Sequence, residues 1–160
     1  MGLIFTVGED AAVERLRDPA LGLPGQTPQY ITAAEADVQI RALSGPLDDL
    51  TIPKTPFVMV RTQSIAFVNG TGVTSHLNRD ADAVLDIWAM HKTRRGEQDI
   101  DGVMAVAQQI DSILNAAKLQ VSASPFLTGY FETATIGFDE YEEIPVARIN
   151  VLVRYQQDLA

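Results

Sequence analysis

Hydrophobic and polar residues alternate most regularly near the end of the chain, from Val146 to Gln156. The apolar side chains of one face are Ala147, Ile149, Val151, Val153 and Tyr155. A period of two is typical of a strand with one face on a core. The stretch from Gly129 to Phe138 precedes this strand, and a polar loop, 139–143, separates the two. Because strands that are neighbours in sequence tend to pair, we predict a hairpin from Gly129 to Gln156.

The period changes to that of a helix from about Gln98 to Lys118. The apolar stripe of this segment consists of Val103, Ala107, Ile110, Leu114 and Ala117. Asp99 and Asp101 stand at its start and Lys118 at its end, where their charges favour the helix dipole. We predict a long helix packed across one face of the sheet.

Two shorter helices are predicted before residue 55. The first runs from Thr6 to Arg17 and is stopped by Pro19. A loop rich in proline and glycine follows it at 18–29. The second helix begins with a capping box at Thr32-Ala-Ala-Glu35 and ends at Gly45-Pro46.

Short apolar runs between these helical segments predict further strands. Phe57–Arg61 is one strand, and Ile65–Val68 either continues it or forms another. Asn69-Gly70 predicts a tight turn. The next strand is Val84–Met90, with Trp88 on the face opposite its aliphatic side chains. A further short stretch, 119–122, follows the long helix.

Together these elements predict an α+β protein. We expect one antiparallel or mixed sheet, a long helix packed on one face, and one or two N-terminal helices. The chain, 1–160, is interpreted as a single domain. Residues 1–55 supply the N-terminal helices and the loop, and residues 56–160 supply the core of sheet and helix.

Composition narrows the range of functions. The 160 residues are 46% hydrophobic, and 21 acidic against 12 basic residues give a net charge of −9. This charge excludes a broad basic face for nucleic acid. There is no cysteine, and His76 and His91 are the only histidines, so we expect no cofactor and no metal. No signal-peptide pattern or membrane-spanning run occurs, so no membrane partner is expected.

Three polar segments are candidates for catalytic or ligand sites. The stretch 70–75 is rich in glycine but lacks the third glycine or the lysine of a phosphate loop, which favours a hairpin turn. His76 lies near Asp80, without a nucleophile-elbow motif. Asp80, Asp82 and Asp86 do not match a calcium loop, and we interpret them as the solvated start of a strand. We therefore expect no enzyme.

Two charged clusters are candidate subunit or partner contacts. The basic cluster consists of Lys92, Arg94 and Arg95. It is solvated, paired with nearby acids, or bound to a partner. The acidic cluster consists of Asp139, Glu140, Glu142 and Glu143. It is a solvated hairpin loop, an electrostatic docking element, or a wall that repels DNA phosphate.

The order of these elements resembles that of tail-terminator proteins of tailed bacteriophages. The resemblance lies in Leu43-Ser-Gly-Pro-Leu-Asp-Asp-Leu50, in Pro56-Phe-Val-Met-Val60 and in the Trp88 strand. The helix Val103–Ala117 and a final hairpin ending in Ile149-Asn-Val-Leu-Val-Arg-Tyr155 complete it. The likeness covers the whole chain in outline and is best from about Leu43 to Tyr155. It rests on apolar patterns and element order.

The resemblance implies a structural virion protein that forms a homohexameric ring. Such a ring caps the finished tail tube, stops tube polymerisation, and joins the tail to a neck or head-completion connector. DNA passes through its lumen without specific binding. The protein is then located in the virion, in the tail and neck, after assembly in the host cytoplasm. Ring interfaces are heterologous, so the basic and acidic clusters are a candidate complementary pair across them.

Two other functions remain open from the sequence. One is a head-completion or neck connector protein, which also forms a ring but docks on the portal side. The other is a small cytoplasmic ligand-binding domain that uses the sheet face near Trp88. An enzyme would need a histidine among convergent carboxylates.

Overall fold

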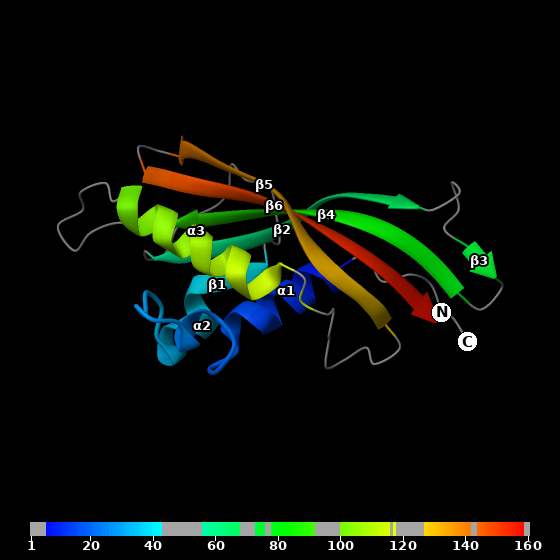
Figure 1. Ribbon diagram of the computed structural model, residues 1–160, viewed down its shortest axis with the longest axis horizontal. Helices are drawn as coiled ribbons and strands as arrows, with labels where there is room; N and C mark the ends of the chain where they lie inside the picture. Colours follow the sequence, from blue (N-terminus) through cyan, green and yellow to red (C-terminus); the bar gives the residue numbers. More distant parts are fainter. Residues whose placement is uncertain are drawn as a thin grey trace.

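The computed structural model describes most of the chain, and the elements below are those of the described residues. These residues are 6–42, 56–67, 73–75, 78–91, 100–115, 117, 127–141 and 144–158. In chain order the elements are α1 (Val7–Arg17), η1 (Leu23–Gly25), α2 (Ala33–Gln39), β1 (Ile40–Ala42), β2 (Phe57–Phe67), β3 (Val73–Ser75), β4 (Asn78–Met90), α3 (Ile100–Leu114), β5 (Leu127–Tyr141) and β6 (Ile144–Asp158). The helices gather on one side of the sheet (Figure 1).

One mixed sheet forms the body of this α+β protein, as the sequence predicts. Its strand order is β1-β2-β4-β6-β5, and β3 pairs with the start of β4. β1 runs parallel to β2, and the other pairs are antiparallel. The predicted C-terminal hairpin is confirmed, with Tyr141 opposite Ile144 at its closed end. A bulge between Thr133 and Thr135 interrupts the register of β5.

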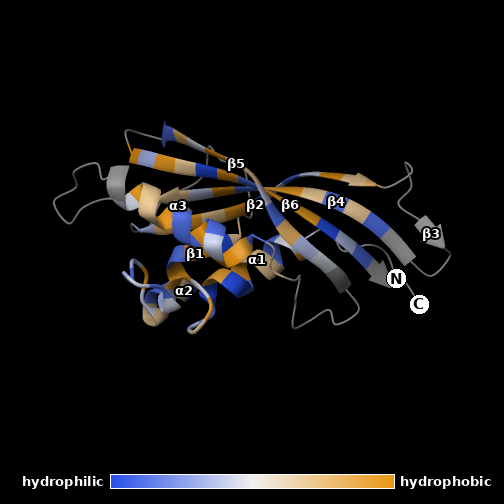
Figure 2. Ribbon diagram, viewed as in Figure 1, coloured by the Kyte–Doolittle hydropathy of each residue, from blue (hydrophilic) through white to orange (hydrophobic). Residues whose placement is uncertain are grey.

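The core lies on the helix-bearing face of the sheet. The five apolar residues that alternate along β6 are all buried, which confirms the predicted face: Ala147, Ile149, Val151, Val153 and Tyr155. Hydropathy alternates in the same way along β4 (Figure 2). The apolar stripe of α3 belongs to the same buried cluster as these strand residues, and so do Ala11 and Leu16 of α1. Burial of these side chains is the main force that holds the fold together.

α1 approaches the sheet closely through a glycine. A Cβ added to Gly8 would lie 3.3 Å from Cδ2 of Leu85 and 3.5 Å from Cγ2 of Val153. The absence of a side chain at this position lets the helix backbone rest on β4 and β6. The helix itself was predicted from Thr6 to Arg17 and is found from Val7 to Arg17, with Thr6 as its N-cap residue.

The second helix is much shorter than predicted. Thr32 and Glu35 form the expected capping box, but α2 ends at Gln39 and the chain continues as β1. The reason is a tertiary contact: the guanidinium of Arg17 donates to the carbonyl oxygens of Asp37 and Ile40. These carbonyls are satisfied without a further helical turn. Ile40 is therefore free to bury its side chain in the core and to pair opposite Val58.

The strands are longer than the sequence suggests. β2 is one strand from Phe57 to Phe67, and β4 begins at Asn78 rather than at Val84. β5 reaches Tyr141, so Asp139 and Glu140 lie in a strand and not in the predicted loop. Pairing with β6 explains this extension, because an acidic residue fits a strand where its side chain faces water. The predicted turn at 69–70 and the predicted strand at 119–122 lie outside the described residues.

Asp18 closes the turn that follows α1. Its Oδ1 accepts hydrogen bonds from the backbone N–H groups of Ala20, at 2.8 Å, and Leu21, at 2.9 Å. The bond from Leu21 and then the bond from Ala20 lower the pKa of the Asp18 carboxyl below its ordinary value of 3.8. A carboxyl with a lowered pKa in the folded state stabilises the protein above its unfolded-state pKa. This contribution is lost as the pH falls through the folded-state pKa.

We expect Asp18→Ala to lower the melting temperature at neutral pH because the two N–H groups lose their acceptor. The difference from the wild-type protein should shrink as the solution is made acidic. Thermal unfolding followed by circular dichroism across this pH range measures it. A difference that stays constant into acid would contradict the role given to the ionised carboxylate.

Candidate functional site

The face of the sheet opposite the core carries several charged side chains. On this face β4 presents Asp80, Asp82 and Asp86 in alternate positions, followed by Trp88. A second apolar cluster lies near one end of the face and consists of Phe57, Met59, Trp88, Met90 and Val146. The face thus has an apolar end and a charged middle.

Asp86 is the centre of a buried polar cluster on this face. Its carboxylate is only 1% exposed. One oxygen, Oδ2, accepts three hydrogen bonds: from the guanidinium groups of Arg61, at 3.0 Å, and Arg148, at 3.1 Å, and from the indole N–H of Trp88, at 2.9 Å. The registers place these groups together, because Arg61 lies opposite Asp86 and Arg148 lies opposite Trp88. The Arg148 guanidinium also lies 4.9 Å above the Trp88 ring.

This cluster corrects the interpretation of Asp86 as part of a solvated strand start. A buried carboxylate is tolerated only when it is paired and hydrogen-bonded. Here two arginines supply the charge, and their side chains remain 31% and 43% exposed for Arg61 and Arg148. Because one acid meets two bases, the cluster keeps one net positive charge. The indole of Trp88 is buried beneath the Arg148 guanidinium. The ligand-binding domain predicted as an alternative would use the sheet face near Trp88, and on that face Arg148 covers the indole.

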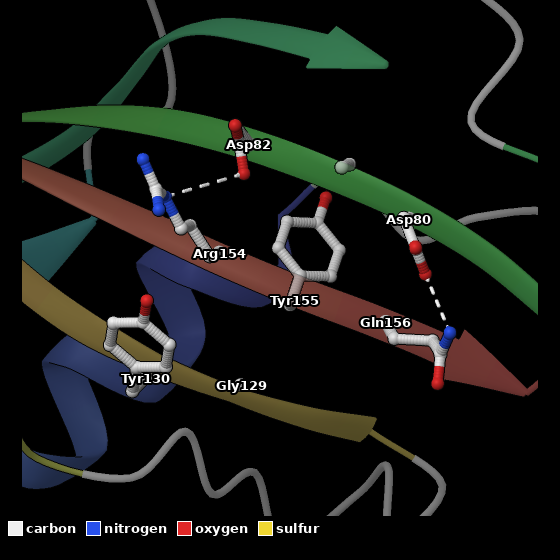
Figure 3. Close-up of a pocket in the computed structure, with 8 residues that line it drawn as sticks. Asp80, Asp82, Gly129, Tyr130, Arg154, Tyr155 and Gln156 are labelled. Atoms are coloured by element: carbon white, nitrogen blue, oxygen red, sulfur yellow. Dashed lines mark hydrogen bonds and ion pairs between the residues drawn. The ribbon is translucent and has the colours of Figure 1, made fainter. Parts of the chain in front are cut away.

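A shallow hollow lies further along the same face, between β4, β6 and β5 (Figure 3). Its volume is about 340 Å³, and its lining includes Asp82, Tyr130, Arg154 and Gln156. Gln156 donates to Asp80 at 2.7 Å, and Arg154 lies 3.9 Å from Asp82. The Arg154 guanidinium donates a hydrogen bond to the phenol oxygen of Tyr130. This hydrogen bond, then the charge interaction with Tyr130 and then the charge of Asp82 raise the pKa of Arg154. The arginine therefore stays cationic at every physiological pH.

Gly129 forms part of this hollow because no side chain fits there. A Cβ at this position would lie 2.3 Å from the carbonyl oxygen of Arg154 and 2.9 Å from the Cα of Tyr155. We expect Gly129→Ala to destabilise the protein by about 1–3 kcal/mol, since backbone atoms must move. Gly137 on the same strand is the matched control, because nothing lies within 4 Å of an added Cβ there. Urea unfolding should show Gly137→Ala within about 0.5 kcal/mol of wild type; equal effects of the two changes would contradict this packing.

The structure describes only part of the two charged clusters predicted as contacts. Asp139 and Glu140 are exposed at the end of β5, opposite Val146 and Pro145 of β6. The remaining members lie outside the described residues: Lys92, Arg94, Arg95, Glu142 and Glu143. Met90, the last residue of β4, is level with Asp139, because both lie opposite Val146. In sequence, the basic cluster begins two residues after Met90, the end of β4 that is level with Asp139.

An exposed apolar surface lies beside the acidic cluster. Within the part of the chain that the structure describes, six large hydrophobic side chains are exposed, and three of them lie on β5: Tyr130, Ile136 and Phe138. Ile136 and Phe138 face the helix-bearing side, because they lie opposite the buried Ile149 and Ala147. A hollow of about 200 Å³ beside Phe138 is lined also by Val103, Glu140 and Pro145. We call Ile136, Phe138, Asp139 and Glu140 the β5 surface.

Of the two histidines, the structure describes His91. His91 lies edge-on to the ring of Tyr30, with the ring centroids 5.3 Å apart. His76 lies outside the described residues. In the described ranges no three histidine, aspartate or glutamate side chains come together as a metal-binding group. No helix in the same ranges is both long enough and apolar enough to cross a membrane.

Neither protein-family models nor the sequences of curated proteins gave a match to this chain. The site must therefore be interpreted from its own chemistry. The sequence predicts neither the Asp86 cluster nor the exposure of Ile136 and Phe138 on the β5 surface. Strand alternation places Trp88 and Asp86 on one face, but the partners of Asp86 lie on other strands and depend on the registers.

Proposed function

We propose that this protein is the subunit of a ring that caps the tail tube of a bacteriophage and joins it to the neck. The observation that carries the proposal is the β5 surface. An edge strand with exposed Ile136 and Phe138 is a surface that a stable soluble protein normally covers. Contact with another subunit covers it. The resemblance in element order to tail-terminator proteins supports the same function.

A ring of this kind needs two different contact surfaces on each subunit. In a heterologous interface a patch on one copy binds a different patch on the next, and the ring closes when the rotation is complete. The β5 surface fits one side of such a contact, since it combines apolar area with a charged rim. The net charge of −9 supports the passage of DNA through the lumen, because phosphates are repelled and not held.

Co-purification separates this function from its nearest alternatives. The protein is immobilised and exposed separately to tail tube protein and to portal protein, and its own mass is followed by sedimentation. A tail terminator should bind the tube protein and sediment as an assembly. Binding to the portal alone would indicate a head-completion or neck connector. A monomer that binds neither would contradict the proposal and favour a ligand-binding domain.

A further inference from the structure

Among the described residues, contacts to the outer edge of β5 are found along its first half. The backbone N–H of Phe131 donates to the carbonyl oxygen of Ala117, at 2.9 Å. The backbone N–H of Thr133 donates to Oδ1 of Asn115, at 3.1 Å. Both acceptors belong to residues that come just after α3 in the chain. The end of this helix therefore protects the first half of the edge from pairing with another strand.

Beyond the bulge, the described residues leave the outer edge of β5 unpaired. Phe131 and Thr133 direct their N–H groups outward, and the extra residue of the bulge shifts the alternation by one position. The outward backbone groups are then those of Ile136 and Phe138. Among the described residues none makes a backbone hydrogen bond to them from outside the sheet. At Glu140 the N–H is already bonded to Oδ1 of Asp139, at 2.8 Å, which ends the open stretch.

We propose that this open edge accepts the basic segment Lys92–Arg95 of a second copy as an added strand. The proposal rests on the ring proposed above and names one of its interfaces. Charge complementarity selects the occupant, because this segment is the basic cluster of the chain and the edge ends in acidic residues. Within one chain the Phe138 side chain is 55% exposed, so it offers apolar area for a second copy to cover.

Strand addition supplies both affinity and specificity at this edge. Main-chain hydrogen bonds form to Ile136 and Phe138, as in other cases of strand addition. Glu140 lies on the same face as Phe138, and Asp139 lies on the opposite face. In the added strand Lys92 and Arg94 share one face and Arg95 takes the other. Basic side chains on either face therefore meet a carboxylate.

Single cysteines test this contact between copies. The chain has no cysteine of its own. One protein carries Gly137→Cys, at the position with open space around its Cβ, and a second carries Thr93→Cys. Mixed and oxidised, they should form a disulfide-linked heterodimer, which no contact within one chain can produce. The matched control replaces Thr93→Cys by Gln63→Cys, an exposed position on β2, and should give little of this product.

Charge reversal then tests the stated chemistry. Arg94→Glu and Arg95→Glu, added to the Thr93→Cys protein, should lower the heterodimer yield on the order of tenfold or more. Asp139→Lys and Glu140→Lys, added to the Gly137→Cys protein, should restore the yield with the reversed segment. Absence of the heterodimer in a protein that sediments as an assembly would overturn this interface and leave the ring standing. Absence of both the heterodimer and the assembly would overturn the interface and the proposed function together.

Discussion

Replacement of Asp86 by alanine is expected to lower the free energy of unfolding by about 2–4 kcal/mol. The change removes the acceptor of the Trp88 indole N–H, and leaving a buried donor unpaired costs about 1–3 kcal/mol. It also removes the partner of Arg61 and Arg148. Both arginines are partly exposed, so water compensates some of their loss, and the effect stays below that of a fully buried pair.

Asp82→Ala is the matched control for this prediction. Asp82 lies on the same strand and the same face, and its arginine partner is also on β6, but the side chains of Arg154 and Asp82 are 53% and 40% exposed. An exposed ion pair contributes little, and the control should stay within about 0.5 kcal/mol of wild type. Urea unfolding at one protein concentration measures both variants, since assembly adds to apparent stability. Equal losses of stability from the two substitutions would contradict the stabilising role given to the buried Asp86 carboxylate.

Asp86→Asn separates the contribution of the carboxylate charge from that of the indole hydrogen bond. The amide keeps an oxygen that accepts from Trp88, but it carries no charge for the two guanidinium groups. We expect a loss of stability between those of wild type and Asp86→Ala. If the asparagine variant were as unstable as the alanine variant, the charge would dominate over the indole hydrogen bond.

The second large effect is expected on assembly. Phe138→Asp should weaken association between copies by about tenfold to a hundredfold per interface, because burial of a phenylalanine side chain contributes about 1.5–3 kcal/mol. The folded monomer should be unaffected, since this side chain is exposed. Sedimentation velocity over a range of concentrations measures the association.

Leu21→Asp is the matched control for Phe138→Asp. Leu21 is 56% exposed, against 55% for Phe138, and it lies in the loop after α1, away from β5. The two substitutions therefore replace apolar side chains of similar exposed fraction and add the same charge. We expect Leu21→Asp to assemble as the wild-type protein does. Assembly of both variants at wild-type concentrations would show that the β5 surface is not a subunit contact.

Local periodicity explains which elements could be predicted from the sequence. The alternation in β6 and the apolar stripe of α3 are set by residues close in sequence, so the face of each was evident. α2 was overestimated because its end depends on Arg17, which binds the carbonyl of Ile40 from 23 residues away. No local signal marks that contact.

The candidate site was hard to predict for the same physical reason. Asp86 resembles its partly exposed neighbours Asp80 and Asp82 in sequence, and its burial depends on partners 25 and 62 residues away. Prediction of the β5 surface requires knowing that β5 is an edge strand, and this follows only from the strand order. The acidic cluster was found from charge alone, but its extension into β5 required the register with β6.

Electron microscopy in negative stain tests the central claim most directly. The purified protein is imaged alone and after mixing with tail tubes. We expect closed rings as wide as the tube, free in solution or seated on tube ends. Monomers in the first sample and bare tube ends in the second would contradict the ring.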